Sequence, residues 1–169
     1  PQGNPVQDAR VGKSLILTSG AKIEGWRHFV ARQKLPRTDA GGYFDLPPMH
    51  AGSQIAVFAY KDGSAGVWSD RVTLGTSGPF TLPDLILAPG AAEIAGRVVD
   101  ASGEPVDDAV VTLLDLGPPP TATDSEGRFH FSRIGKREYP MNVTSEHGRW
   151  YGKVEANTLE LEVKLSPDY

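Results

Sequence analysis

The sequence contains no cysteine. This absence excludes disulfides, thiolate zinc sites and cysteine nucleophiles, although it does not fix the cellular compartment. No run approaches the ~20 consecutive apolar residues that a helix needs to span a bilayer, so we expect no membrane insertion. No window of about 11 residues carries a capped helical stripe, because proline and glycine interrupt most candidates. The chain starts at Pro1 without a basic-then-apolar leader, and we therefore expect a processed product or a fragment.

The sequence also lacks an excess of basic charge. Its formal net charge is −4, whereas a protein that binds nucleic acid normally carries a strong basic footprint. The charge is uneven along the chain. Residues 1–88 hold 9 Lys and Arg against 7 Asp and Glu, whereas residues 89–169 hold 8 against 14. A nucleic-acid partner is therefore not expected.

Turn-forming residues are abundant, with 19 glycines and 14 prolines among 169 residues. Each half of the chain would be close to the lower size limit for a self-sufficient core. The composition is typical of a globular chain with many turns. It predicts one ordinary domain or two small β domains.

A nine-residue pattern occurs twice, as TDAGGYFDL at residues 38–46 and as TDSEGRFHF at residues 123–131. At an offset of 85 residues the shared positions are Thr38, Asp39, Gly42 and Phe44 with Thr123, Asp124, Gly127 and Phe129. Such self-similarity indicates two copies of one structural unit.

The pattern predicts a β-hairpin corner. Asp at the first turn position accepts hydrogen bonds from the backbone amides that follow it, and Gly at the fourth tolerates the geometry that the turn leaves there. After the turn, Phe129 and Phe131 alternate with polar residues, as Phe44 and Leu46 do. This is the period of a strand with one buried face.

The repeat extends on both sides of the corner. We align Gly12 with Gly96, Trp68 with Trp150, and Leu85–Leu87 with Val163–Leu165. Further strands are predicted from β-branched or alternating runs at residues 94–99, 109–114, 141–144 and 159–165. Pro89-Gly90 separates the two copies, which gives predicted domains at residues 1–88 and 91–169.

The second copy resembles the carboxypeptidase regulatory-like domain, a transthyretin-like (prealbumin-like) β-sandwich. The resemblance rests on G-x-V at Gly96, G-x-P-V-x-x-A-x-V at Gly103 and T-D-x-x-G-x-F at Thr123, and it covers residues 93–165. The first copy is a degenerate version that lacks the Gly-x-Pro-Val element after Gly12. The resemblance implies an all-β fold of two tandem seven-stranded Greek-key, Ig-like sandwiches. It also implies an accessory module without catalytic residues, so we expect no enzyme activity and no cofactor.

Metal and catalytic sites find little support in the residues. The four histidines, at positions 28, 50, 130 and 147, show no metal-ligand spacing and do not recur between the copies. Asp39 with Asp45, or Asp124 with Glu126, suggests calcium at the corner, but neither pair reaches the ligand count of a calcium loop. Turn capping is the favoured role for these carboxylates, and we expect no metal site.

The most distinctive binding candidate is a basic segment in the first copy. It contains Trp26, Arg27, Arg32, Lys34 and Arg37 without an acidic residue. Exposed tryptophan can stack on a sugar or a peptide side chain, and the basic residues would attract an anionic polymer. The alternative interpretation is a solvated strand and loop. Trp68 and Trp150 share a repeat position, which favours core packing over ligand binding.

Two functional hypotheses follow. The first is a non-catalytic structural or interaction module, a spacer or assembly segment of a larger exported bacterial protein. Its partners would be other domains of the parent protein or a protein partner, in an extracellular, cell-surface or periplasmic location. The second is a carbohydrate- or peptide-binding module that uses Trp26 and the basic segment, with polysaccharide as a ligand. Edge strands offer a further route to protein partners.

Overall fold

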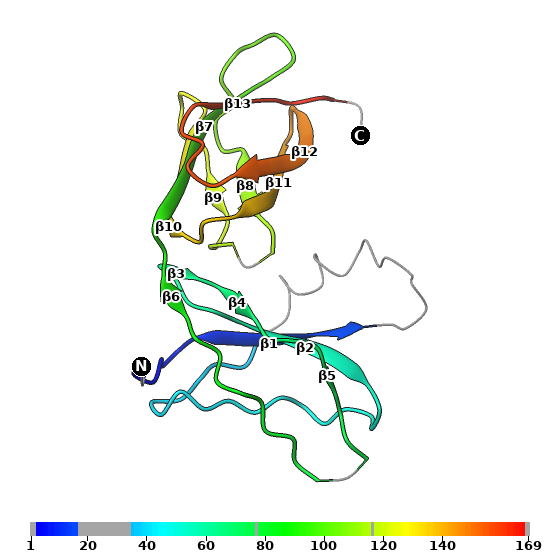
Figure 1. Ribbon diagram of the computed structural model, residues 1–169. Helices are drawn as coiled ribbons and strands as arrows, with labels where there is room; N and C mark the ends of the chain where they lie inside the picture. Colours follow the sequence, from blue (N-terminus) through cyan, green and yellow to red (C-terminus); the bar gives the residue numbers. More distant parts are fainter. Residues whose placement is uncertain (1–2, 17–34, 77, 116, 168–169) are drawn as a thin grey trace. The chain divides into compact units, whose positions relative to one another are not determined.

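The computed structural model describes residues 3–16, 35–76, 78–115 and 117–167. Every regular element in these residues is a β-strand, so the all-β prediction is confirmed for the described chain (Figure 1). Within the same residues no helix is long and apolar enough to cross a membrane. The chain divides into two compact units. Unit 1 comprises residues 1–61 and 66–87, and unit 2 comprises residues 62–65 and 88–169.

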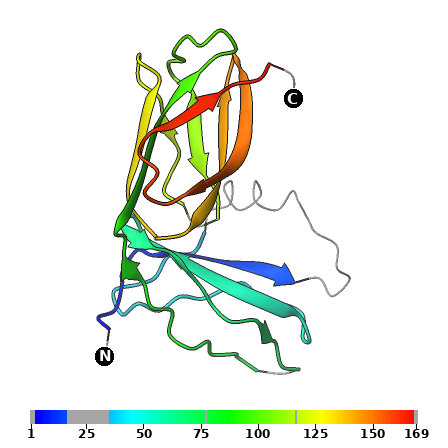
Figure 2. The same ribbon diagram turned by 45° about the horizontal axis from the view of Figure 1, so that its top comes forward.

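Unit 2 contains two facing β-sheets. One has three strands in the order β10-β7-β13, and the other has four in the order β12-β11-β8-β9. The first sheet consists of β7 (Ala92–Val99), β10 (Arg128–Ile134) and β13 (Leu161–Lys164). The second consists of β8 (Val110–Leu113), β9 (Thr121–Ala122), β11 (Glu138–Ser145) and β12 (Gly148–Glu155). Figure 2 shows the two sheets as separate layers.

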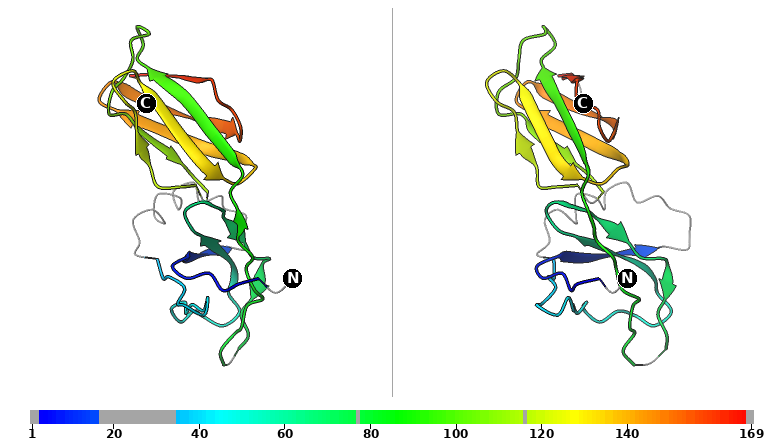
Figure 3. Two further views of the ribbon diagram at one scale, coloured as in Figure 1. Left: turned by 90° about the vertical axis from the view of Figure 1, so that its left-hand side faces the viewer. Right: turned by 60° about the vertical axis from the view of Figure 1, so that its left-hand side comes forward.

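Strand β7 is the centre of the three-stranded sheet. It pairs antiparallel with β10, where Phe129 lies opposite Gly96, and parallel with β13, where Val163 lies opposite Val98. The antiparallel pair of β7 and β10 is clearest in the left panel of Figure 3. The alternating apolar residues of β7, Ile94 and Val98 among them, are fully buried. β7 therefore supplies both backbone pairing and core side chains to this layer.

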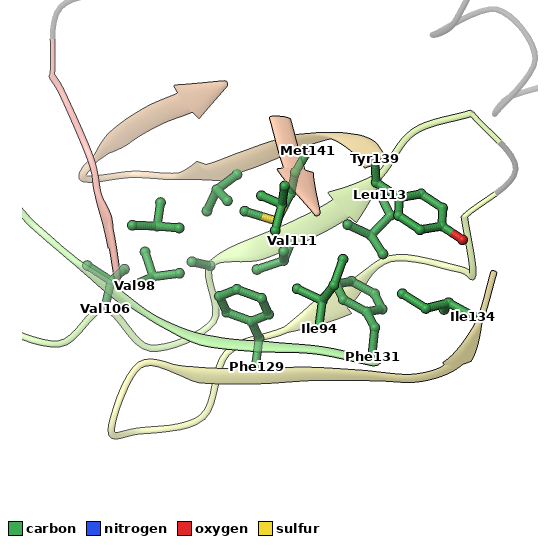
Figure 4. Packing of buried hydrophobic residues seen from close by; sticks show 14 of the residues in the cluster. Ile94, Val98, Val106, Val111, Leu113, Phe129, Phe131, Ile134, Tyr139 and Met141 are labelled. Carbon is green, nitrogen blue, oxygen red and sulfur yellow. The ribbon is translucent and has the colours of Figure 1, made fainter. Parts of the chain in front are cut away.

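The core of unit 2 lies between its sheets. Phe129, Phe131 and Ile94 come from one layer, and Val111 and Met141 from the other; all are at most 5% exposed. Figure 4 shows these side chains pointing toward one another across the space between the layers. The alternation predicted for the strands is the cause, because successive side chains of a strand point to opposite faces.

Two short strands complete unit 2. β3 (Ser64–Ala65) pairs antiparallel with β6 (Ala88–Pro89). The amide of Gly90 donates to the carbonyl of Gly63 at 2.9 Å, and the amide of Ala91 donates to the carbonyl of Ile134 at 3.0 Å. The backbone that follows residue 87 is therefore hydrogen-bonded where it enters unit 2.

Unit 1 has one sheet in its described residues. β1 (Arg10–Ile16) pairs antiparallel with β2 (Gln54–Tyr60). The strand β2 also pairs with β4 (Val67–Trp68) and β5 (Val72–Thr73). Val11, Ile55, Val57 and Ala59 form the buried core on one face of this sheet. The prediction of seven strands in this half stays a prediction.

The second layer of unit 1 is irregular. Residues 43–49 and 82–87, which we call the open layer, place Phe44, Leu46, Leu85 and Leu87 against the core, each only partly buried. Neither segment forms a strand. The strand predicted at Phe44–Leu46 is therefore wrong, although the alternation of inward and outward side chains is present. Within the described residues, no backbone hydrogen bond joins residues 44–49 or 79–87 to another segment.

Candidate functional site

The corner at Thr123 is built from a buried hydroxyl. Thr123 is 4% exposed. Its Oγ1 donates to the carbonyl of Val106 at 2.7 Å and accepts from the amide of Ala109 at 2.9 Å. The backbone of Thr123 forms two further bonds, to the carbonyl of Ala109 and from the amide of Asp108. A hydroxyl side chain is required here, because valine has the shape of threonine but neither the donor nor the acceptor.

Asp124 closes the turn that follows. Its Oδ1 accepts from the amides of Glu126 at 3.0 Å and Arg128 at 2.8 Å. The amide of Gly127 donates to the carbonyl of Asp124, and Gly127 has φ of 73°, in the left-handed region. The carboxylate is thus used as a turn cap.

The corner at Thr38 forms the same hydrogen bonds. Thr38 Oγ1 donates to the carbonyl of Val6 at 2.5 Å and accepts from the amide of Ala9 at 2.9 Å. Asp39 Oδ1 accepts from the amides of Gly41 and Tyr43 at 2.8 and 2.9 Å. Gly42 has φ of 79°. The two corners therefore agree in their bonding as well as in their residues.

This agreement corrects the alignment of the first copy. Val6, Asp8 and Ala9 bond to Thr38 as Val106, Asp108 and Ala109 bond to Thr123, so the Gly-x-Pro-Val element of unit 1 is Gly3-Asn-Pro-Val6. The prediction that the first copy lacks this element is wrong, and so is the match of Gly12 with Gly96. The sequence signal, GNPVQDARV beside GEPVDDAVV, lies before Gly12 at an offset of 100 residues.

One neighbour distinguishes the two corners. A Cβ placed on Gly127 would lie 2.4 Å from the carbonyl oxygen of Val98 in β7, and 3.3 Å from Pro105 and Val106. A Cβ placed on Gly42 would meet Pro5 and Val6 at the same 3.3 Å, and no atom of the described residues would lie closer. Among the described residues, the place that Val98 takes beside Gly127 has no occupant beside Gly42.

Most of the predicted binding segment lies outside the described residues. This applies to Trp26, Arg27, Arg32 and Lys34. Arg37 is exposed, and its guanidinium Nη1 donates to the carbonyl of Asp8 at 3.4 Å, a long bond. Its binding role stays a prediction.

The aromatic residues have a different register from the predicted one. Trp68 lies opposite Phe58, whereas Trp150 lies opposite Val143. Because Val143 pairs with Val111 as Ala59 pairs with Val11, the counterpart of Trp150 is Val67. The match of Trp68 with Trp150 is therefore wrong by one residue. Trp150 packs partly buried against the core of unit 2. The ring of Trp68 is tilted by 60° against that of Phe58, with centroids 5.1 Å apart.

The described histidines and carboxylates do not gather into a site. No group of three or more His, Asp or Glu side chains in the described residues could hold a metal ion. His130 Nε2 lies 2.8 Å from Glu93 Oε2, on the exposed side of the three-stranded sheet. His147 is near Glu146, and His50 is exposed.

Asp100 caps the turn between β7 and Pro105. Its Oδ1 accepts from the hydroxyl of Ser102 at 2.7 Å and from the amide of Glu104 at 3.0 Å. These hydrogen bonds lower the pKa of Asp100, and the bond from the Ser102 hydroxyl has the largest effect. Because folding lowers this pKa, the ionised carboxylate of Asp100 stabilises the folded state at neutral pH. This stabilisation is lost as the pH falls through the lowered pKa.

A shallow depression of about 680 Å³ lies on the outward side of the three-stranded sheet. Its lining includes Arg97, Arg128, His130, Glu160 and Glu162. Arg97 donates to the carbonyl of Glu126 and His130 pairs with Glu93, so these groups are already engaged with protein partners.

Comparisons with known proteins agree with the resemblance in unit 2. Residues 93–165 match the family model of the carboxypeptidase regulatory-like domain. No curated protein matches the chain.

Among solved structures, the chain is similar to the minor pilin GBS52 of Streptococcus agalactiae, with 14% identity and a TM-score of 0.38, over 99% of this chain and 87% of that one. It is also similar to the TIE protein of Bacillus anthracis, again at 14% identity and a TM-score of 0.38, over 96% of this chain and 35% of that one. These similarities are too distant to transfer a function.

Proposed function

We propose that this chain is a non-catalytic structural or interaction module, a spacer or assembly segment of a larger exported bacterial protein. The observation that carries the proposal is the use of the repeated polar residues. The side chains of these residues form hydrogen bonds with backbone groups of their own corners, at Thr38, Asp39, Thr123 and Asp124. The repeated pattern thus maintains a fold and leaves no reactive group at the shared positions.

The family match at residues 93–165 supports this proposal, because the domain is named as regulatory-like. In the proposal, unit 1 is a second, incomplete copy of the same sandwich. The location is extracellular, cell-surface or periplasmic, and the partners are other domains of the parent protein or a separate protein.

The linker tests the spacer role. Gly90 and Ala91 have hydrogen-bonded amides, so a broad-specificity protease is expected not to cut between residues 88 and 92 while the chain is folded. Limited proteolysis of the full chain, with fragment masses, measures this. The matched comparison is the same digestion in urea, where the bonds are absent. Rapid cleavage at Pro89-Gly90 in the native chain would contradict the proposed spacer role.

A second candidate function is binding of carbohydrate or peptide through Trp26 and the basic segment. One observation favours it. Val11 and Thr38 are 27 residues apart, whereas their counterparts Val111 and Thr123 are 12 apart, so unit 1 carries an insertion of 15 residues that contains Trp26. Inserted connections between strands often carry function.

Acrylamide quenching of tryptophan fluorescence tests this candidate. We expect Trp26→Phe to remove the readily quenched part of the emission, and a panel of polysaccharides to protect that part in the unmodified chain. Trp68→Phe is the matched control, because Trp68 is partly buried and its ring contacts that of the buried Phe58. Shielded Trp26 with no response to any glycan would leave only the structural role.

A further inference from the structure

The open layer of unit 1 occupies the place that β10 and β13 hold in unit 2. The corner at Gly42 leads into Phe44 and Leu46, as the corner at Gly127 leads into Phe129 and Phe131. In unit 2 these phenylalanines are about 5% exposed because β7 lies beside them, whereas Phe44 and Leu46 are only partly buried. The exposed Tyr43 and Ile86, at 77% and 72%, belong to the same layer.

Two backbone groups mark the missing position. In unit 2, Val98 of β7 donates its N–H to the carbonyl of Gly127 at 2.8 Å, and its carbonyl accepts the N–H of Val106 at 3.1 Å. The counterparts in unit 1 are the carbonyl of Gly42 and the N–H of Val6. Neither makes a hydrogen bond with any residue that the structure describes. A strand residue in the position of Val98 would satisfy both groups, and unpaired backbone groups of this kind attract an added strand.

The spacing of the chain indicates where such a strand would come from. Val98 precedes Pro105 by seven residues, and the connecting turn is Asp100–Glu104. Counted back from Pro5, the same spacing places the counterpart of Val98 three residues upstream of Pro1.

We propose that the open layer of unit 1 takes up an extended strand of the β7 type, attached directly upstream of Pro1. The strand carries apolar side chains at alternate positions and a glycine or another small residue at the position of Gly96. Gly96 is needed in β7 because a Cβ there would lie 2.4 Å from the carbonyl oxygen of Leu161 and 2.8 Å from the ring of Phe129, and Phe44 is the counterpart of that ring. This inference goes beyond the proposed function, which the linker digestion tests separately.

The test adds the strand to the full chain. The sequence of residues 91–100 is fused directly before Pro1, and amide hydrogen exchange is followed by NMR in the fused and the unmodified chain. We expect the amides of Val6 and of the open layer to exchange at least about tenfold more slowly in the fusion. The amide of Val106, already bonded to Val98, should exchange at the same rate in both.

Two controls make the result specific. A fusion with Val98→Pro in the added copy lacks the N–H that would bond Gly42, and we expect it to lose most of the protection. A fusion with the ten residues in shuffled order should give none.

Three outcomes would overturn the proposal. The first is unchanged exchange at Val6 in the fusion, and the second is strong protection of Val6 in the chain without it. The third is protection by the free peptide of residues 91–100 but not by the fusion, which would assign the strand to a separate chain.

Discussion

Replacing Gly127 by alanine is expected to destabilise unit 2 by at least about 3 kcal/mol, whereas Gly42→Ala costs unit 1 only about 1 to 2 kcal/mol. Both glycines have left-handed φ angles, 73° and 79°, so both substitutions carry a similar conformational cost of about 1 to 2 kcal/mol. Only at Gly127 does the new Cβ approach a backbone oxygen, that of Val98, at 2.4 Å.

The additional cost at Gly127 comes from β7. Backbone cannot rotate away as a flexible side chain can, so relief of the clash moves β7 and weakens the two hydrogen bonds of Val98. Each such bond contributes about 1 kcal/mol.

Hydrogen exchange of the full chain measures both units in one sample, with Met141 reporting on unit 2 and Val57 on unit 1. Equal losses at Gly127 and Gly42 would show that the carbonyl of Val98 yields without cost. If the fused strand described above adds to unit 1, Gly42→Ala in the fusion should become as costly as Gly127→Ala.

Replacing Phe129 by alanine is expected to destabilise unit 2 by about 3 to 5 kcal/mol, the cost of truncating a fully buried phenylalanine. Phe129 is 5% exposed, lies over Gly96 and meets Phe131 edge-on with centroids 6.2 Å apart. The matched change Phe44→Ala should cost unit 1 about 1 to 2 kcal/mol, because a partly buried ring loses less apolar contact.

Thermal unfolding and hydrogen exchange of the full-length variants test this pair. Phe129→Leu is the control that keeps most of the buried volume, and it should recover most of the lost stability. An equal loss for Phe44→Ala would show that the open layer is already covered as completely as its counterpart.

The sequence was sufficient for features that depend on near neighbours. The corner at Asp124 is one example, because the amides that bond its carboxylate lie two and four residues further along the chain. The alternation of Phe129 and Phe131 with polar residues likewise identified the buried face of β10. These predictions needed only turn geometry and the period of a strand.

The sequence singled out Trp26, Arg27, Arg32, Lys34 and Arg37 from local composition, and of these the structure describes Arg37 alone. What the structure added is the alignment of Val11 and Thr38 with Val111 and Thr123, which shows that the first pair is separated by more residues in the sequence than the second. That comparison depends on the pairing of β1 with β2 and of β8 with β11.

By itself the sequence determined the all-β class of the described residues, two equivalent corners and the alternation of inward and outward side chains after each corner, since these follow from bonds within a few residues and from side-chain period. Only the tertiary structure decided the register of Trp68 and Trp150, the contact of Val6 with Thr38 across 32 residues, and the absence of a strand at Phe44–Leu46. In each case the feature depends on contacts between segments that lie far apart in the sequence. A strand exists only when another segment satisfies its backbone hydrogen bonds, and no described residue takes beside Phe44 the position that β7 holds beside Phe129.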